Sequence, residues 1–461
     1  GIPMTSNPET PVVSNVTLSE LRSDVNKRGT IDSYIYGPDE QVTTYFVREI
    51  RPCAAFSKMP VLLNTGNGSN KFGGTFTMPI NASGDYLLAL TAYISISAGK
   101  LRSYAAGTES SYFPKLAHKL IKSVRLKVDA KPLVELSSNF MDTWSEFMID
   151  GGNYEAYTNM VGGDFQYSRS VDIGAKTLVL PIPLYFSRDS GVALPIGMMV
   201  NNRVTVEFVF RKLSDLLIKE NVPDTGAGTG FMNMLTDGDF ATPPEITKFE
   251  VVADFAVVTD FEIDRTSCSP HYILMEKPTD IAATEILKPT EAGSTLSYDI
   301  EHSSGILKAL FFGVRNITHS EYLDYYEVGL PKSNNGVRSI GVSALSKIGI
   351  KCGDRYRVPM LPAEHFVFME PYRAACRVPT RNRGQYMYSF ALDLKTVDPK
   401  GSINPSNFNS SISVVIEPSE ALRNSAETFE FTAIALTSYI LYIDNGSLKK
   451  IDNGGDFNED P

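Results

Sequence analysis

The segment Asp224-Thr225-Gly226 is the part of this sequence that most resembles a catalytic motif, because Asp-Thr-Gly is the short motif of aspartic proteases. That chemistry needs the aspartate on a loop after an apolar strand, with a second carboxylate about 3 Å away. Here Asn221-Val222-Pro223 precedes the motif and a run of glycines follows it. We therefore expect a flexible loop at this position and no catalytic role for Asp224.

The sequence gives no support for a phosphate-binding loop, a metal site or a nucleophile elbow. The pattern Gly226-x-Gly228-x-Gly230 lacks the entering strand and leaving helix of a phosphate-binding loop. Histidines never stand at i, i+2 or i, i+4 from one another, which is the usual spacing of metal ligands; they are His118, His271, His302, His319 and His365. Gly-x-Ser-x-Gly, the nucleophile elbow, does not occur. The sequence predicts no catalytic residue, no cofactor and no metal.

Acidic, cysteine and sequon patterns also have structural explanations. The acidic end (Asp452, Asp456, Glu459 and Asp460) lacks the ordered ligand spacing of an EF-hand, so we expect an extended tail. Four cysteines without C-x-x-C spacing predict free thiols made in a reducing compartment; they are Cys53, Cys268, Cys352 and Cys376. In a chain that is not secreted, sequons such as Asn15-Val16-Thr17 stay unmodified.

Charge argues against a nucleic-acid coat. The formal net charge is −10 and no basic run occurs, whereas coating phosphates requires many Lys and Arg side chains. The apolar stretch Phe431–Ile443 is too short to span a bilayer, which takes about 20 residues. No signal peptide opens the chain, so we expect a soluble protein that does not follow the usual secretory route.

Period-2 alternation of apolar and polar residues dominates the chain and predicts half-buried strands. The four clearest examples are Ser123–Val128, Arg203–Phe210, Lys248–Val257 and Tyr388–Lys395. Helical signals are few: Leu213, Leu216 and Leu217 suggest a helix in Arg211–Glu220, and Met141–Met148 suggests a short helical turn. With 461 residues, two or three domains are expected, and all-β is the predicted class.

A Gly- and Pro-rich segment, Asn221–Pro244, divides the chain into two halves of similar length and reads as a linker or long loop. Sliding Thr75–Ile94 onto Thr295–Val314, an offset of 220, needs no gap. Identities then include Ile80/Ile300, Leu87/Leu307 and Leu90/Leu310. This internal similarity favours two copies of one β fold.

The segment Leu180-Pro-Ile-Pro-Leu-Tyr-Phe-Ser-Arg-Asp-Ser-Gly-Val-Ala-Leu-Pro-Ile196 is the most distinctive stretch. It resembles a signature of the major capsid proteins of nucleocytoplasmic large DNA viruses, particularly iridoviruses and their marseillevirus and ascovirus relatives. Shorter pieces follow in the order typical of that family: Thr44-Tyr-Phe-Val-Arg-Glu49, Trp144-Ser-Glu-Phe147, Asn316-Ile-Thr-His319, Met369-Glu-Pro-Tyr372, Tyr388-Ser-Phe-Ala-Leu392 and Asn445-Gly-Ser447. Together these pieces extend over residues 44–447.

This resemblance implies two tandem eight-stranded jelly rolls with long loop insertions. We divide the chain into an N-terminal arm (1–33), a first jelly roll (34–220), a linker (221–244), a second jelly roll (245–447) and an acidic tail (448–461). The implied function is structural: a homotrimeric, pseudo-hexagonal capsomer of an icosahedral virion, assembled in the host cytoplasm. Implied partners are copies of itself, minor capsid and penton proteins and an inner membrane layer, without direct contact to nucleic acid.

Within the resemblance, Arg188, Asp189, Ser190 and Gly191 are expected to form a structural turn. An Arg188–Asp189 pair with Ser190 as a cap would fix the loop after the strand Leu178–Phe186. The arm before Tyr34 and the charged tail after Ser447 depart from iridovirus chains, so their contacts are not carried over.

Three polar insertions are too long for tight hairpins, and we expect them to form an exposed crown; they are Gly99–Pro114, Gly151–Asp172 and Glu321–Gly341. The termini are expected near the opposite, inner pole. Two other functions remain as alternatives. One is a carbohydrate-binding β-sandwich that uses exposed Tyr154, Tyr157 and Tyr167, and the other is a glycosidase with two distant carboxylates.

Overall fold

The computed structural model describes residues 16–37, 43–63, 65–103, 108–164, 166, 168–221, 232–300, 305–317, 343–380, 382–405 and 411–451. The chain divides into two units, Gly1–Cys53 and Ala54–Pro461. In the first unit, α1 (Leu18–Asn26) begins with a capping box in which Thr17 and Glu20 satisfy each other's backbone amides. A shorter helix, α2 (Thr30–Ile35), follows, and neither helix has a buried residue.

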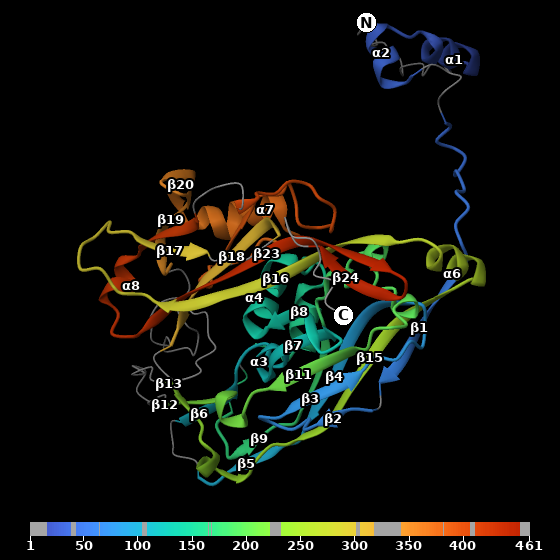
Figure 1. Cartoon of the computed structure of the whole chain (residues 1–461). Coiled ribbons are helices and arrows are strands. Elements are labelled where there is room, and N and C mark those ends of the chain that lie inside the picture. The colour runs from blue at the N-terminus through green and yellow to red at the C-terminus, as the bar shows by residue number, and fades with distance from the viewer. Residues whose placement is uncertain are drawn as a thin grey trace, which may run out of the picture. The chain divides into compact units, whose positions relative to one another are not determined.

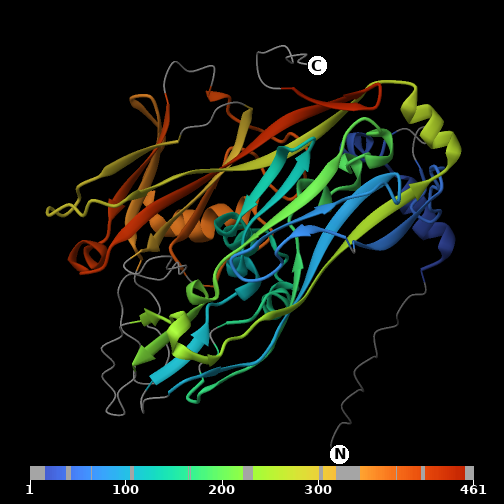
Figure 2. The same ribbon diagram turned by 60° about the horizontal axis from the view of Figure 1, so that its bottom comes forward.

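The second unit contains two antiparallel β-sandwiches, which lie side by side in Figures 1 and 2. In the first sandwich, one sheet has the spatial order β1 (Phe56–Leu63), β15 (Ile246–Val258), β4 (Tyr86–Ile96) and β10 (Lys176–Pro181). The facing sheet has the order β2 (Asn67–Gly68), β3 (Thr75–Pro79), β11 (Val204–Phe210), β7 (Ile121–Val128) and β8 (Lys131–Ser137).

In the second sandwich, one sheet has the order β16 (His271–Glu285), β23 (Phe429–Asp444), β18 (Ile306–Asn316) and β21 (Gln385–Ser389), and β24 (Ser447–Ile451) also pairs with β23. The facing sheet has the order β17 (Leu296–Ile300), β22 (Ile412–Pro418), β19 (Leu345–Cys352) and β20 (Arg355–Pro362).

Both sandwiches follow the same strand order. When the eight principal strands of each are numbered along the chain, one sheet has the order 1-8-3-6 and the other 2-7-4-5 in both cases. This is the jelly-roll order, which brings strands that are distant in sequence together over one core. The predicted all-β double jelly roll is therefore confirmed.

The internal repeat found by the 220-residue offset is confirmed as well. It places β3 on β17 and β4 on β18, and these pairs occupy the second and third positions in their respective jelly rolls. Offset residues such as Leu90 and Leu310 point into equivalent interiors and are fully buried.

The predicted boundary between the two halves is wrong at the strand that follows the linker. β15 pairs with β1 along one edge and with β4 along the other, so it completes the first sandwich. By strand pairing, the division falls at α6 (Asp260–Ser267), between β15 and β16. The Gly- and Pro-rich segment Asn221–Pro244 therefore precedes the last strand of the first jelly roll, and it does not mark the end of that jelly roll.

Three of the four predicted strands are present as β7, β11 and β15. The fourth ends early, because β21 stops at Ser389, whose hydroxyl bonds to both the amide and the carbonyl of Ala391 and turns the chain. Leu392, expected on the buried face, is 81% exposed. The helix expected in Arg211–Glu220 is wrong, since one 3-10 turn (η4, Leu213–Asp215) is followed by a strand, β12 (Leu217–Asn221).

Short elements fill the connections of the first sandwich. Small sheets join β6 (Thr108–Tyr112), β12 and β13 (Met232–Met234), and likewise β5 (Gly99–Leu101), β9 (Asp172–Ile173) and β14 (Phe240–Thr242). Helices are α3 (Leu116–Leu120), α4 (Ser138–Met148) and α5 (Tyr154–Met160). The 3-10 turns are η1 (Tyr185–Ser187), η2 (Ser190–Val192), η3 (Ile196–Met198) and η5 (Asp237–Asp239).

In the second sandwich, one π-helical turn, η6 (His365–Met369), leads into α7 (Glu370–Ala374), and α8 (Glu420–Asn424) precedes β23. Two of the three expected crown loops contain buried residues, such as Phe113 and Val161, and are therefore not purely exposed insertions. The third, Glu321–Gly341, and Asp224 lie outside the described residues.

The buried side chains form two apolar cores. One lies inside the second sandwich. The other fills the first sandwich and continues through α4 onto the outer face of β18, β21 and β23. All four cysteines are free, as predicted. In the part of the chain that the structure describes, no helix is long and apolar enough to cross a membrane.

Candidate functional site: a buried charged joint between the two sandwiches

Helix α4 forms the joint between the two sandwiches. It begins where the Ser137 hydroxyl accepts a hydrogen bond from the Phe140 amide, the usual N-cap contact. Ten of its eleven residues are buried, which means that both faces of the helix are covered. Trp144 and Phe147 pack against Phe311 of β18, with ring centroids 6.0 and 6.2 Å apart. The predicted helical turn at Met141–Met148 is confirmed and carries this contact.

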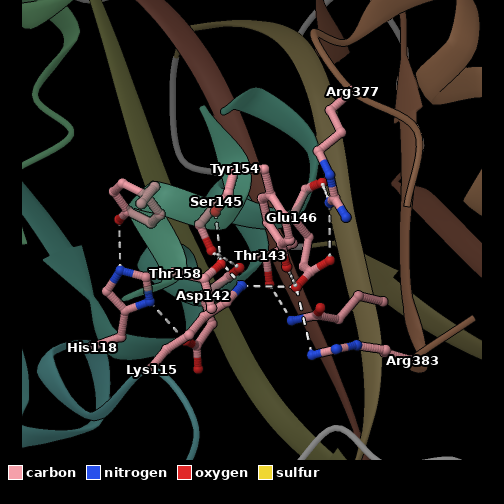
Figure 3. A network of polar contacts seen from close by, with 12 residues as sticks. Lys115, His118, Asp142, Thr143, Ser145, Glu146, Tyr154, Thr158, Arg377 and Arg383 are labelled. Carbon is pink, nitrogen blue, oxygen red and sulfur yellow. Dashed lines mark hydrogen bonds and ion pairs between the residues drawn. The ribbon is translucent and has the colours of Figure 1, made fainter. Parts of the chain in front are cut away.

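A carboxylate on α4, Glu146, gathers partners from both sandwiches (Figure 3). From the first sandwich, Lys115 Nζ and the Tyr154 hydroxyl each donate to Glu146 Oε1 at 2.7 Å. From the second sandwich, Arg377 Nη1 donates to the backbone carbonyl of Glu146 at 2.6 Å and lies 3.3 Å from Oε2. Arg383 lies 3.9 Å from Oε1. This carboxylate is therefore an ionic link across the joint.

One turn earlier on the same helix, Asp142 binds two side chains of α3. Its Oδ1 lies 2.9 Å from His118 Nδ1, and its Oδ2 pairs with Lys119 Nζ. The other ring nitrogen of His118 lies 2.7 Å from the Tyr157 hydroxyl. The His118 ring is completely buried, and Asp142 and Tyr157 are buried as well.

The environment fixes the charge of each group. Burial by itself raises the pKa of Asp142, but Lys119 and the hydrogen bond from His118 outweigh it and lower the pKa to about 2. Burial opposes ionisation of Glu146 too, yet Lys115 and Arg383 hold its pKa well below the usual range. Although burial disfavours the Lys115 cation, Glu146 raises its pKa. Both carboxylates are consequently ionised at neutral pH.

His118 is neutral in this environment, because burial lowers its pKa more than Asp142 raises it. Facing an ionised carboxylate, its Nδ1 carries the proton and donates to Asp142. Its Nε2 then accepts a hydrogen bond from the Tyr157 hydroxyl. An Asp–His–hydroxyl chain of this kind resembles a catalytic relay, but none of its three side chains is accessible to a substrate. The arrangement positions helices and does not activate a nucleophile.

A second charged cluster lies beside the first and includes the family signature. Arg188 stacks over the Trp144 ring at 4.8 Å, donates to the Leu394 carbonyl at 2.9 Å and pairs with Glu276 of β16. Glu276 also pairs with Lys308 of β18, whose Nζ donates to the Thr396 carbonyl at 3.0 Å. The guanidinium of Arg188 thus links the first sandwich to the second.

The signature residues do not make the pair that their sequence suggested. Asp189 accepts a hydrogen bond from the Gly191 amide at 2.8 Å and caps η2, whereas Ser190 begins this turn. Arg188 pairs with Glu276 rather than with Asp189. The expected ion pair is therefore wrong, since Arg188 finds a fully buried carboxylate from the neighbouring sandwich.

The charged network of α3 and α4 was not predicted from the sequence. One signal was available: Asp142 and Glu146 are four residues apart, a spacing that places two carboxylates on one face of a helix. Their basic partners come from positions 115–119 and 377–383, and no spacing rule connects these segments. Among the described residues, no group of three or more His, Cys, Asp or Glu side chains is arranged to hold a metal ion.

The tyrosines proposed for carbohydrate binding are engaged in the same joint. Tyr157 is buried against His118, and Tyr154 lies under the Arg377 guanidinium at 3.3 Å. Tyr167 lies outside the described residues. The two described tyrosines do not form an exposed aromatic platform, so this prediction is wrong for them.

Two family models together match most of the chain. A model described as "Major capsid protein N-terminus" matches residues 44–239, and one described as "Large eukaryotic DNA virus major capsid protein" matches residues 262–448. The chain is 68% identical to the major capsid protein of Spodoptera frugiperda ascovirus 1a, covering 97% of this chain and 100% of the relative. It is 35% identical to that of Trichoplusia ni ascovirus 2c, covering 94% and 92%.

Among solved structures, the fold is similar to that of VP54 from PBCV-1, fitted into a reconstruction of the virophage Sputnik. The TM-score is 0.71 at 17% sequence identity, covering 88% of this chain and 99% of VP54. At this identity the likeness supports the double jelly-roll fold alone.

Proposed function

The chain belongs to the family of major capsid proteins of large eukaryotic DNA viruses, and on this premise we propose that it builds an icosahedral shell as a homotrimeric, pseudo-hexagonal capsomer. The observation that carries the proposal is the repeated strand order, 1-8-3-6 facing 2-7-4-5, in both sandwiches. Three chains with two similar sandwiches each give six similar bodies around one axis. Such a three-fold object can tile a hexagonal lattice.

The charged joint supports this role because a shell subunit must keep its two sandwiches in one fixed relation. Removing one partner of a buried ion pair is strongly destabilising, so such pairs favour the one arrangement in which every buried charge keeps its partner. The Glu146 and Glu276 clusters each connect side chains of both sandwiches, so they resist rotation of one against the other. The buried side chains of His118, Asp142 and Glu146 are all hydrogen-bonded or ion-paired within the protein. We therefore propose a structural role without catalysis.

The proposed partners follow from the same role. They are copies of this chain within and between trimers, minor capsid and penton proteins at the lattice boundaries, and an inner membrane layer beneath the shell. Direct contact with packaged nucleic acid is not part of the proposal, because the net charge is −10. The proposed location is the virion, after synthesis in the host cytoplasm, which suits four free cysteines.

Native mass measurement at micromolar concentration tests the proposal. We expect a stable species of about three times the 50.7 kDa of one chain, with more than about 2,000 Å² buried per chain, as in permanent assemblies. Averaged electron micrographs of this species are expected to show a six-lobed outline with three-fold symmetry. A folded monomer would overturn the trimer, and binding of glycans by that monomer would favour the carbohydrate-binding alternative.

A further inference from the structure

We infer that a small cavity at the joint binds one ordered water molecule, which links Tyr185 of the first sandwich to Glu276 of the second. This water completes a joint in which one buried hydroxyl has no partner among the described residues. The site lies within a single folded chain, so the inference does not depend on the trimer proposed above.

The cavity lies where the edge of the first sandwich meets the second sandwich. Its walls come from β8, α4 and the segment that enters η1 on one side, and from β16 and β23 on the other. The strand β16 packs against both β8 and η1, and the labels of β8, α4 and β16 lie together in Figure 1. The space that a water-sized sphere can occupy is about 10 Å³, which is room for one water molecule and too little for a larger ligand.

The hydroxyl of Tyr185 is the group that requires this ligand. Tyr185 is 4% exposed and lines the cavity, yet its Oη has no hydrogen-bond partner among the described residues. Burial raises the pKa of this hydroxyl, which therefore keeps its proton and can donate it. Leaving a buried hydroxyl unpaired costs its full desolvation free energy. Native proteins pair such groups with other protein groups or with ordered water.

The cavity also carries the other partners that a water molecule needs. Arg188 and Glu276 both line it and pair with each other. A carboxylate oxygen accepts more than one hydrogen bond, so the pairs with Arg188 and Lys308 leave Glu276 able to accept another. A guanidinium has more N–H donors than its bonds to Glu276 and the Leu394 carbonyl use. A water in the cavity therefore donates to Glu276 and accepts from Tyr185 and Arg188.

Two other states of the cavity fit its lining less well. Stable empty cavities are apolar, whereas the carboxylate in this wall is only 2% exposed and is charged. An anion such as chloride would gain from Arg188 and Lys308 but would lie against the carboxylate of Glu276. Water suits both sides, because it donates to the carboxylate and accepts from the groups that carry N–H and O–H.

The site gives the signature segment a second link to the second sandwich. Tyr185 begins η1 and Arg188 is the residue that ends it, so both side chains come from one turn of the chain. Arg188 reaches Glu276 directly, and Tyr185 reaches it through the water. The two links hold the same turn against β16.

A crystal structure at a resolution that shows ordered waters tests the site directly. We expect one density peak within hydrogen-bond distance of both Tyr185 Oη and the Glu276 carboxylate. A cavity without density would overturn the inference. So would anomalous scattering at the peak after chloride is exchanged for bromide, because it would identify the occupant as an anion.

The sign of the stability change in Tyr185→Phe is an independent test, because phenylalanine keeps the ring and removes only the hydroxyl. If the hydroxyl binds a water, its loss is expected to lower the thermal midpoint by roughly 1–2 degrees in a chain of 461 residues. If the hydroxyl has no partner, its removal relieves an unpaired buried group. The midpoint then rises or stays the same, and either result would overturn the inference.

Filling the cavity is expected to reverse that sign. Val134 lines the cavity, and Val134→Ile adds a methyl group where the water lies. The hydroxyl then has no ligand, so adding Tyr185→Phe is expected to raise the midpoint of Val134→Ile.

Val206→Ile is the matched control, because Val206 is a buried valine of β11 that does not line the cavity. In that background Tyr185→Phe is expected to lower the midpoint as it does in the wild type. Circular dichroism checks that each variant is folded. An equal effect of Tyr185→Phe in the Val134→Ile and wild-type backgrounds would overturn the assignment of the water to this cavity.

Discussion

Phe311 and Phe312 are consecutive residues of β18, yet they belong to different cores. Phe311 points outward and packs against Trp144 and Phe147 of α4. Phe312 points inward and packs against Phe366, Tyr386 and Phe431 of the second sandwich. A strand covered on both faces couples two bodies that could otherwise fold apart. The joint is therefore an extension of the first core, and the second sandwich adds a core of its own.

Truncation of Phe311 or Phe312 to alanine distinguishes the two cores experimentally. Phe311→Ala and Phe312→Ala are each expected to lower the free energy of unfolding by about 3–5 kcal/mol, because both side chains are fully enclosed. Only Phe311→Ala is expected to change the emission of Trp144 in the folded protein. Urea unfolding followed by circular dichroism and by tryptophan fluorescence makes the comparison. An unchanged Trp144 spectrum in folded Phe311→Ala would contradict a single continuous core.

The ionic part of the joint is tested by Glu146→Gln. Loss of this carboxylate leaves Lys115 and Arg377 buried without their counter-charge, which is expected to cost about 3 kcal/mol. Glu207→Gln is the control, since its partners Arg125 and Lys127 lie on the partly exposed outer face of β7 and a change below about 1 kcal/mol is expected there. Equal effects of the two substitutions would mean that burial does not strengthen the joint.

Acid is expected to weaken the joint in two stages. His118 has a folded pKa below its unfolded value of 6.5, so the unfolded state binds more protons below that pH and stability begins to fall. Asp142 has a folded pKa of about 2 against 3.8 when unfolded, so its contribution, about 2 kcal/mol at neutral pH, is lost between about pH 4 and pH 2.

Asp142→Asn removes the Asp142 share of the second stage, to which the low pKa of Glu146 also contributes, and it shifts overall stability. The informative quantity is the slope of the free energy of unfolding against pH, which is expected to flatten between pH 4 and pH 2. His118→Gln is expected to flatten only the stage that begins near pH 6.5. If the Asp142→Asn slope matched that of the wild type, the low pKa of Asp142 would be disproved.

Whether a strand is exposed on one face or buried on both decided how well it could be predicted from the sequence. Strands with one solvated face, such as β7 and β11, alternate clearly and were predicted correctly. β18 is buried on both faces, so alternation is absent and only its similarity to β4 pointed to it. β15 was assigned to the wrong sandwich, because pairing with β1 across nearly the whole first jelly roll leaves no local signal. The partners of Glu146 were missed for the same reason: Lys115 is distant in sequence from Arg377 and Arg383, and these side chains come together only in the folded chain.

The smallest expected effect concerns Arg188, the link between the signature segment and the second sandwich. Its planar guanidinium stacks on Trp144 while also bonding Glu276 and the Leu394 carbonyl, and a lysine ammonium cannot do all three. Arg188→Lys keeps the charge beside Glu276, so the expected cost is only about 1 kcal/mol, the scale of one cation–π contact. Trp144 emission is expected to shift, because the guanidinium no longer covers the ring.

Asp189→Asn is the neighbouring control, since an amide oxygen still accepts the Gly191 hydrogen bond and neither stability nor emission should change. If Asp189→Asn proved more disruptive than Arg188→Lys, the segment would act through its local turn and not through the joint.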